Sequence, residues 1–156
     1  MRSLTVCLAL SLMLVGIPVR AETFRSPGPL FSITYPDGWK IQPAGGGLLT
    51  RAIGPGSAMN VSVAAASQAD FDADRFSDTL GGKRAAYFRW RARTEVPSGP
   101  VETVGYYVAT AHRGLVYSVT GVTKARLARR TQPLIQGAIE SFRFLETGAP
   151  SEAEAP

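Results

Sequence analysis

Apolar and polar residues alternate along much of the chain, which is the pattern of half-buried strands. The clearest case runs from Tyr87 to Thr94, where Phe88, Trp90 and Ala92 point to one side and three arginines point to the other. Similar runs span residues 31–35, 48–53, 59–65, 106–111 and 115–123. Because turns rich in glycine and proline separate these runs, we expect neighbouring strands to pair antiparallel.

Two segments have the three-to-four-residue spacing of amphipathic helices. The first lies within residues 67–86, where three early aspartates would cap the helix, Phe76 and Leu80 would form its apolar stripe, and Gly81-Gly82 would weaken or end it. The second lies within residues 126–142, and Pro133 places its start near Thr131 because proline fits best in a first turn. The prediction is an α+β domain with two helices on an antiparallel sheet of about five to seven strands.

The first 21 residues have the layout of a secretory signal peptide. A positive start is followed by an apolar run over residues 4–17, and small residues stand at the −3 and −1 positions of a cut after Ala21. The apolar run is shorter than the ~20 residues of a membrane-spanning helix, which disfavours an uncleaved anchor. We therefore expect a periplasmic or secreted bacterial protein, with one domain over residues 22–146 and a disordered tail over 147–156.

The composition limits the chemistry that the chain can carry. Its only cysteine, Cys7, lies in the predicted leader, which excludes disulfides, zinc–thiolate sites and cysteine nucleophiles from the exported chain. Its only histidine, His112, lies at a turn with no carboxylate nearby in the sequence. The aspartates at 70, 72, 74 and 78 lack the glycine and terminal glutamate of a calcium loop, so helix capping explains them better. We expect the protein to have no enzymatic activity and to bind neither a metal ion nor a cofactor.

Two short motifs resemble the PsbP-like superfamily, and the resemblance extends over about residues 24–146. One is the aromatic-led strand and turn of residues 31–39, and the other is the Ser-Phe-Arg-Phe sequence of residues 141–144. The residues that carry the resemblance are Phe31, Tyr35, Pro36, Gly38, Trp39, Ser141 and Phe142. The resemblance implies an antiparallel sheet flanked by helices, an α/β/α sandwich. It also implies a non-catalytic protein that binds or assembles other proteins, with the DcrB-like envelope proteins as a nearer branch than the PsbP and Mog-type members.

Two clusters of basic residues are candidate partner-binding surfaces of this chain, whose net charge is +5. The members are Arg84, Arg89, Arg91 and Arg93 in the first cluster and Arg126, Arg129 and Arg130 in the second. Either cluster fits an acidic protein or an anionic membrane surface, and either is also explained as a solvated face. Nucleic acid is excluded as a partner because the chain is predicted to be exported and carries no nucleic-acid-binding motif.

Two functions are consistent with these features. The first is an exported accessory protein that binds another envelope protein or a membrane-associated complex. The alternative is a carrier of a small molecule or a lipid, whose cavity aromatic side chains would line between the sheet and a helix. Packing in the core is the simpler explanation of the same aromatic residues. They are Trp39, Trp90, Tyr106, Tyr107 and Tyr117.

Overall fold

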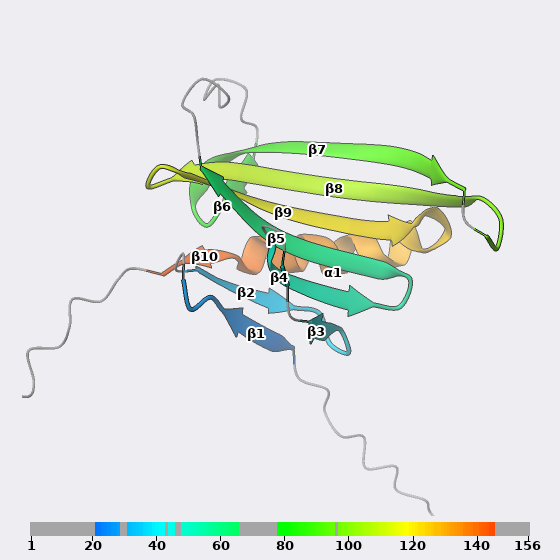
Figure 1. Ribbon diagram of the computed structural model, residues 1–156, viewed down its shortest axis with the longest axis horizontal. Helices are drawn as coiled ribbons and strands as arrows, with labels where there is room; N and C mark the ends of the chain where they lie inside the picture. The colour runs from blue at the N-terminus through cyan, green and yellow to red at the C-terminus, as the bar shows by residue number, and fades with distance from the viewer. Residues whose placement is uncertain are drawn as a thin grey trace, which may run out of the picture.

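Seven of the strands that the structure describes form one large antiparallel sheet (Figure 1). The computed structural model describes residues 21–28, 31–42, 44–45, 48–65, 78–95 and 97–145. Across the large sheet the strand order is β3-β4-β5-β9-β8-β7-β6. In that order the strands are β3 (Lys40–Gln42), β4 (Leu48–Gly54), β5 (Ser57–Ala65), β9 (Leu115–Lys124), β8 (Val101–His112), β7 (Lys83–Thr94) and β6 (Asp78–Leu80).

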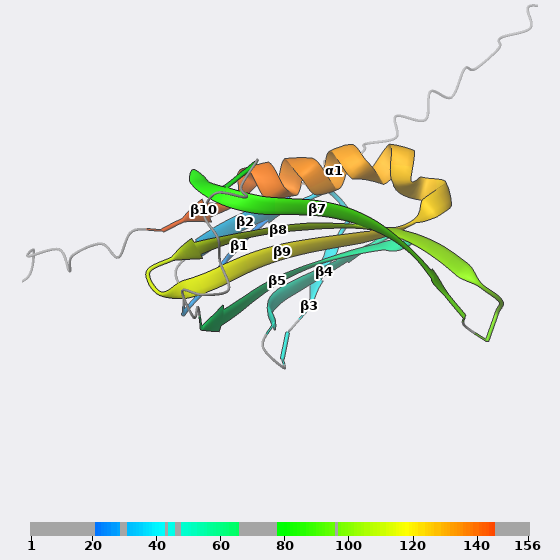
Figure 2. The same cartoon turned by 90° about the horizontal axis from the view of Figure 1, so that it is seen from above.

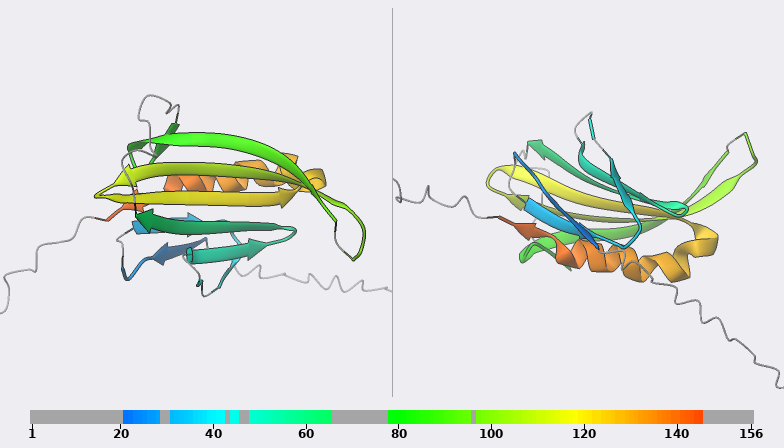
Figure 3. Two further views of the ribbon diagram at one scale, coloured as in Figure 1. Left: turned by 45° about the horizontal axis from the view of Figure 1, so that its top comes forward. Right: turned by 90° about the horizontal axis from the view of Figure 1, so that it is seen from below.

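A small sheet and a helix form a second layer on one face of the large sheet (Figure 2, Figure 3). The small sheet has the order β1-β2-β10, with β1 (Glu22–Arg25), β2 (Phe31–Tyr35) and β10 (Arg143–Phe144). A 3₁₀ turn, η3 (Ala125–Leu127), leads from β9 into the helix α1 (Ala128–Ser141).

The two parts of the second layer cover the same face of β9. Ile135 of α1 packs against Gly121, where an added Cβ would lie 2.5 Å from its side chain, so only glycine leaves room for the helix here. Phe31 of β2 packs edge-on against Tyr117, with ring centroids 6.4 Å apart. Since Tyr117 and Gly121 are four residues apart on one strand, their side-chain positions share a face. We call this the helix-side face of the large sheet.

The predicted first helix is wrong where the structure describes it. Residues 78–80 form strand β6 and residues 83–86 begin β7, joined by a tight turn at Gly81 and Gly82. Both glycines have positive φ, 59° and 76°, which is the backbone conformation of a hairpin turn rather than of a helix end. Leu80 and Ala85 are buried by this hairpin. Residues 67–77 of the predicted helix lie outside the described residues.

The second predicted helix forms, but it starts earlier than Pro133 suggests. The helix α1 begins at Ala128, so Pro133 lies inside it rather than in its first turn. Ala128 and Thr131 are both buried against the sheet, and this packing holds the turn that precedes the proline. Burial of one apolar face therefore outweighs the single backbone hydrogen bond that the proline removes.

The described residues confirm an antiparallel α+β fold in which sheets dominate. They contain one α-helix, on one face of the large sheet, where the resemblance to the PsbP-like superfamily implied helices on both faces. The helix-flanked sandwich is thus not what the described residues form. Residues 1–20 of the predicted signal peptide and the predicted tail 147–156 lie outside the described residues.

Part of the motif lies where the end of α1 meets strand β2. Phe31 and Phe142 are both fully buried and stack with ring centroids 5.1 Å apart. Ser141 Oγ accepts a hydrogen bond from the Thr34 backbone N–H at 2.8 Å and so ties the end of α1 to β2. Tyr35 is buried in the same layer, and its hydroxyl donates to Thr50 Oγ1 at 3.4 Å.

The other half of the motif is a turn that delivers Trp39 to the core. The Trp39 backbone N–H donates to the Pro36 carbonyl at 3.1 Å, and Gly38 takes the positive φ of 75° that this turn requires. The indole then packs over Gly54 of β4, where an added Cβ would lie 2.4 Å from the ring. The motif therefore consists of packing and turn residues.

We expect Phe142→Ala to lower the free energy of unfolding by about 3–5 kcal/mol, because it removes a buried, stacked ring and leaves a cavity in its place. Ser141→Ala is expected to cost about 1–2 kcal/mol by leaving the Thr34 N–H unpaired. Leu134→Ala, at a solvent-exposed position of the same helix, is the control and should change stability by less than about 1 kcal/mol. Urea unfolding followed by tryptophan fluorescence measures all three. Equal stability of the Phe142 and Leu134 variants would contradict this account of the junction.

Candidate functional site

Strand β7 is an edge strand for most of its length. Its first residues, 83–85, pair with β6, and residues 86–94 pair with β8. Along residues 86–94, no strand in the described part of the chain lies on the other side of β7. An edge strand leaves alternate backbone N–H and C=O groups free to pair with another strand. Residues 86–94 are therefore a candidate partner-binding surface.

Three arginines lie on the helix-side face of β7. Arg89 is directly opposite Tyr106 in the sheet register, and its guanidinium carbon is 5.6 Å from the centroid of the Tyr106 ring, a cation–π distance. The Tyr106 hydroxyl in turn donates to Gln132 Oε1 of α1 at 3.2 Å. Tyr106, and with it Arg89, therefore lies on the face of the sheet that the helix covers. Arg91 and Arg93 follow at every second residue on the same face. All three are solvent-exposed, and we call them the arginine stripe.

Arg84, which the sequence places beside these arginines, points to the other face. It is an odd number of residues away from Arg89, so the two side chains lie on opposite sides of the strand. Arg84 is opposite Thr79 of β6 and is also exposed. The four arginines of the first sequence cluster thus divide into a stripe of three and one separate residue.

The second basic cluster begins beside the arginine stripe. Arg126, Arg129 and Arg130 are exposed on η3 and the first turn of α1, and that turn holds no acidic side chain. Arg91 and Arg93 share a shallow hollow of about 220 Å³ with Ala125, the residue before Arg126. The second cluster therefore starts next to the end of the arginine stripe, although the two are far apart in the sequence.

Acidic side chains reduce the positive charge of the arginine stripe only locally. Glu95 pairs with Arg93 at 3.4 Å, but both side chains are more than half exposed, so this ion pair contributes little to stability. Glu102 lines the same shallow hollow. The stripe thus keeps a positive surface that an acidic partner would neutralise.

Three aromatic residues form a cluster on the opposite face of β7 and β8. Phe88 lies opposite Tyr107 with ring centroids 4.8 Å apart, and the Phe88 and Trp90 centroids are 5.6 Å apart. Trp90 lies over Gly105, its register partner, where an added Cβ would fall 2.0 Å from the indole. Phe88 is 53% exposed. We call Phe88, Trp90 and Tyr107 the aromatic platform.

The position of the platform argues against the alternative of a single cavity lined by the five aromatic residues named from the sequence. Tyr106 and Tyr117 are on the helix-side face and Trp39 is in the core, whereas Trp90 and Tyr107 lie on the opposite face of the sheet. These five side chains therefore do not line one cavity. Alternation along β7 separated the arginines from the aromatic residues correctly, but it does not show which side the helix covers. That assignment depends on the register between β7, β8 and β9, which alternation within one strand does not contain.

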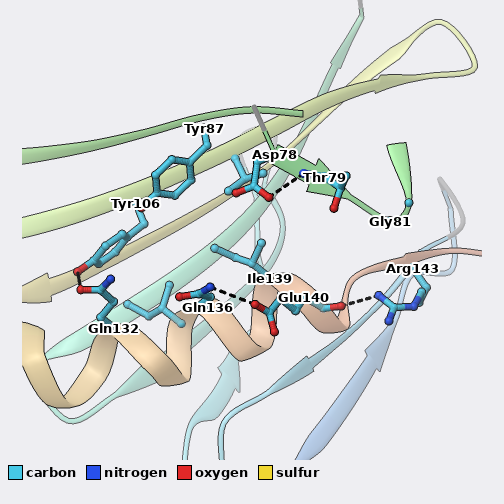
Figure 4. A pocket seen from close by; sticks show the side chains of 13 residues that line it. Asp78, Thr79, Gly81, Tyr87, Tyr106, Gln132, Gln136, Ile139, Glu140 and Arg143 are labelled. Carbon is cyan, nitrogen blue, oxygen red and sulfur yellow. Dashed lines mark hydrogen bonds between the residues drawn. The ribbon is translucent and has the colours of Figure 1, made fainter. Parts of the chain in front are cut away.

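A groove of about 700 Å³ lies between the β6–β7 turn and α1 (Figure 4). Its apolar lining comes from Val108 of β8 and Ile135 and Ile139 of α1. Tyr87 and Tyr106 line it along the sheet, and burial together with the nearby Tyr106 and Asp78 raises the pKa of the Tyr87 hydroxyl. The groove has the size of a small-molecule site.

Polar groups also line this groove. Gln136 Nε2 donates to Glu140 Oε1 at 3.1 Å, and Arg143 donates to the Glu140 backbone carbonyl at 2.5 Å. Asp78 lies on the sheet side, where its carboxylate accepts the Thr79 backbone N–H at 2.7 Å. Each of these side chains has further donor or acceptor atoms besides those in these bonds, so polar groups of a ligand would find partners here.

His112 belongs to a packed aromatic group at the end of β8. Its ring centroid is 4.1 Å from that of Phe144 and 6.4 Å from that of Tyr117. Burial, and after it the positive charges of Arg113 and Lys83, lower the pKa of the imidazole below 6.5. These surroundings favour the neutral imidazole, and the ring packs with its aromatic neighbours.

Within the described residues no group of three or more histidine, cysteine, aspartate or glutamate side chains is placed to hold a metal ion. The helices of the described part are too short or too polar to cross a membrane.

Comparisons with known proteins inform the fold. No protein-family model matches this chain, and no curated protein matches it. A crystal structure of a protein from Bacteroides thetaiotaomicron aligns with a TM-score of 0.62 and 17% identity over 83% of this chain. The alignment covers 50% of that protein, so this chain spans half its length. The solution structure of CyanoP, the cyanobacterial PsbP of Synechocystis, aligns with a TM-score of 0.48 and 12% identity, over 91% of this chain and 99% of CyanoP. At such identities the likeness concerns the fold and not the function.

The lowered pKa of His112 predicts a specific dependence of stability on pH. Below pH 6.5 the unfolded chain binds a proton at this residue more readily than the folded protein does, so this stabilising contribution is present above pH 6.5 and is lost as the pH falls. His112 is the only histidine, so its imidazole resonance in the untagged protein can be titrated by NMR without ambiguity. We expect a pKa below 6.5, and a smaller loss of stability between pH 7 and 5 in His112→Phe. A pKa of 6.5 or above would contradict the packing account.

Proposed function

We propose that this protein is an exported, non-catalytic accessory protein that binds another envelope protein or a membrane-associated complex. We also propose that it belongs to the PsbP-like superfamily. Export is supported by the signal-peptide pattern of the first 21 residues. Membership is supported by the motif residues, because Phe31, Trp39 and Phe142 occupy the core and Gly38 the turn that the motif implies.

The exposure of strand β7 is the observation that carries the binding function. The described chain exposes three large hydrophobic side chains, Tyr87 at 40%, Phe88 at 53% and Leu134 at 46%, and two of them are adjacent on β7. The arginine stripe lies on the same strand. Tyrosine, tryptophan, phenylalanine and arginine are the residue types that supply most of the binding energy in protein interfaces. An edge strand that concentrates them is the best-supported partner surface of this protein.

Charge specifies the kind of partner. The arginine stripe and the neighbouring cluster of Arg126, Arg129 and Arg130 are all exposed, and together they give this part of the surface a positive charge. An acidic protein would be steered to this region, and the association rate would fall as salt screens the charges. The same charges also suit an anionic membrane surface close to the partner.

The groove between the β6–β7 turn and α1 favours a second candidate, a carrier of a small molecule. Its volume of about 700 Å³ is within the usual range for ligand sites, and Val108, Ile135 and Ile139 supply an apolar part of its lining. A compound extracted from the purified protein, whose addition raises the melting temperature, would support the carrier. A lipid is less well accommodated, because charged and amide side chains also line the groove.

We expect a photo-crosslinking residue placed at position 88 to capture a defined protein from the envelope of the native host, because Phe88 protrudes from the aromatic platform. The same residue placed at position 134 is the matched control, since Leu134 is similarly exposed but lies on α1. Crosslinked bands are compared by mass spectrometry at low and high salt. Capture should be reduced at high salt and by Arg91→Glu.

Identical capture from positions 88 and 134 would show nonspecific contact and would contradict a binding surface on β7. Absence of any capture from position 88, with the protein folded and exported, would contradict the accessory function itself. In that case the groove becomes the better candidate, and the search moves to extracted small molecules.

A further inference from the structure

We infer that the partner contributes an extended segment that adds to the free edge of β7 as a further strand, with acidic and apolar residues in alternation. This inference rests on the proposed binding function and specifies how the partner is recognised. The occupant is thus a peptide segment, and its sequence pattern follows from the two faces of β7.

The backbone of β7 provides the attachment. Residues 86–94 pair with β8 on one side, and no described strand pairs with them on the other. In Figure 1, β7 forms the upper edge of the large sheet, with β8 directly below it and no labelled element above it. At ~3.4 Å per residue this edge is about 30 Å long, enough for a strand of about nine residues. Strand addition of this kind gives affinity through main-chain hydrogen bonds.

The side chains of β7 select the sequence. In an added strand, successive side chains point to the same two faces as those of β7, and each one contacts its cross-strand neighbours. On the helix-side face these neighbours are the arginine stripe, whose backbone positions are about 7 Å apart along the strand. On the other face they are Phe88 and Trp90 of the aromatic platform. A segment with acidic residues at every second position and apolar residues between them matches both faces.

The second layer leaves this edge accessible. Figure 2 and Figure 3 show α1 and the small sheet on one side of the large sheet, with the far end of the β7–β8 hairpin extending past α1 and bending away from it. Arg89, Arg91 and Arg93 are exposed although they lie on the helix-side face, which shows that α1 does not reach over them. Phe88 is exposed on the other face.

The test uses the purified protein and synthetic peptides of about nine residues that carry a fluorescent label. One peptide alternates glutamate and valine, and a second has the same composition with its glutamates in one block. Fluorescence anisotropy gives the dissociation constants. We expect the alternating peptide to bind at least about tenfold more tightly, because only alternation places acidic and apolar groups on separate faces. Equal affinities would show that charge alone is recognised and would overturn the inference.

Backbone methylation tests for strand pairing directly. The alternating peptide is prepared with N-methyl groups on all valine nitrogens, or on all glutamate nitrogens, which leaves its charge unchanged. The amide hydrogens of the two sets point to opposite edges of a strand, and only one edge can face β7. We expect one methylated peptide to lose most of its affinity and the other to keep it. If both bind as tightly as the parent peptide, no strand is added and the inference fails.

Charge-reversal variants locate the site. We expect Arg91→Glu to weaken the alternating peptide by at least about tenfold, while Arg25→Glu, an equal charge change at an exposed position of β1, has an effect below about twofold. Circular dichroism checks that both variants are folded. Equal weakening by the two variants would show that only the net charge matters and would overturn the assignment to β7.

The failure of this inference can be distinguished from failure of the proposed function. Capture of a partner from position 88, combined with equal binding of all peptides, would leave the binding function in place and remove strand addition. Binding of the protein to vesicles of anionic phospholipid, with no preference among the peptides, would assign the arginine stripe to a membrane surface and would also overturn the inference. Loss of both capture and peptide binding would contradict the two proposals together.

Discussion

The contact between the end of α1 and strand β2 determines how the layers of this protein are arranged. Ser141 and Phe142 meet β2 through a backbone-to-hydroxyl hydrogen bond and a buried ring stack, although Ser141 and its partner Thr34 are 107 residues apart in the sequence. Closing so long a loop costs conformational entropy, and the buried aromatic area at the junction offsets this cost. With this contact in place, α1 lies across Gly121 of β9 and the small sheet lies beside it. The second layer is therefore centred on the middle of the large sheet, and β7 is left at its margin.

This off-centre position explains why two neighbouring strands of equal length differ so much in exposure. Strand β8 has buried residues on both of its faces, whereas β7 after Ala85 has only half-buried and exposed ones. A strand in that position would be expected to carry polar residues on both faces. Instead β7 has arginines on one face and a phenylalanine and a tryptophan on the other. Because the fold does not require these aromatic groups at the margin of the sheet, their presence there supports a role in binding.

The sequence predicted the elements of this fold better than it predicted their arrangement. Alternation located the strands around residues 31–35, 59–65 and 115–123 because it reflects burial within a single element. It failed at residues 78–86, where a glycine hairpin stabilised by the burial of Leu80 and Ala85 replaces the predicted helix end. It also separated Phe88 and Trp90 from the arginines, yet it did not show that the arginines lie on the helix-side face. That result required the register of three paired strands, which depends on tertiary contacts.

Arginines on a free edge repel a second copy of the same edge and attract an acidic strand. If the β7 edges of two copies paired, their like charges would be brought close, so the stripe opposes self-association at the same place where the backbone would permit it. A partner with acidic residues at the matching positions turns this repulsion into attraction. Each exposed ion pair is nevertheless worth only ~0–1 kcal/mol, so the stripe alone would bind weakly. Most of the affinity must then come from main-chain pairing and from burial of the aromatic platform. The arginines provide the specificity, because they favour acidic strands over basic ones.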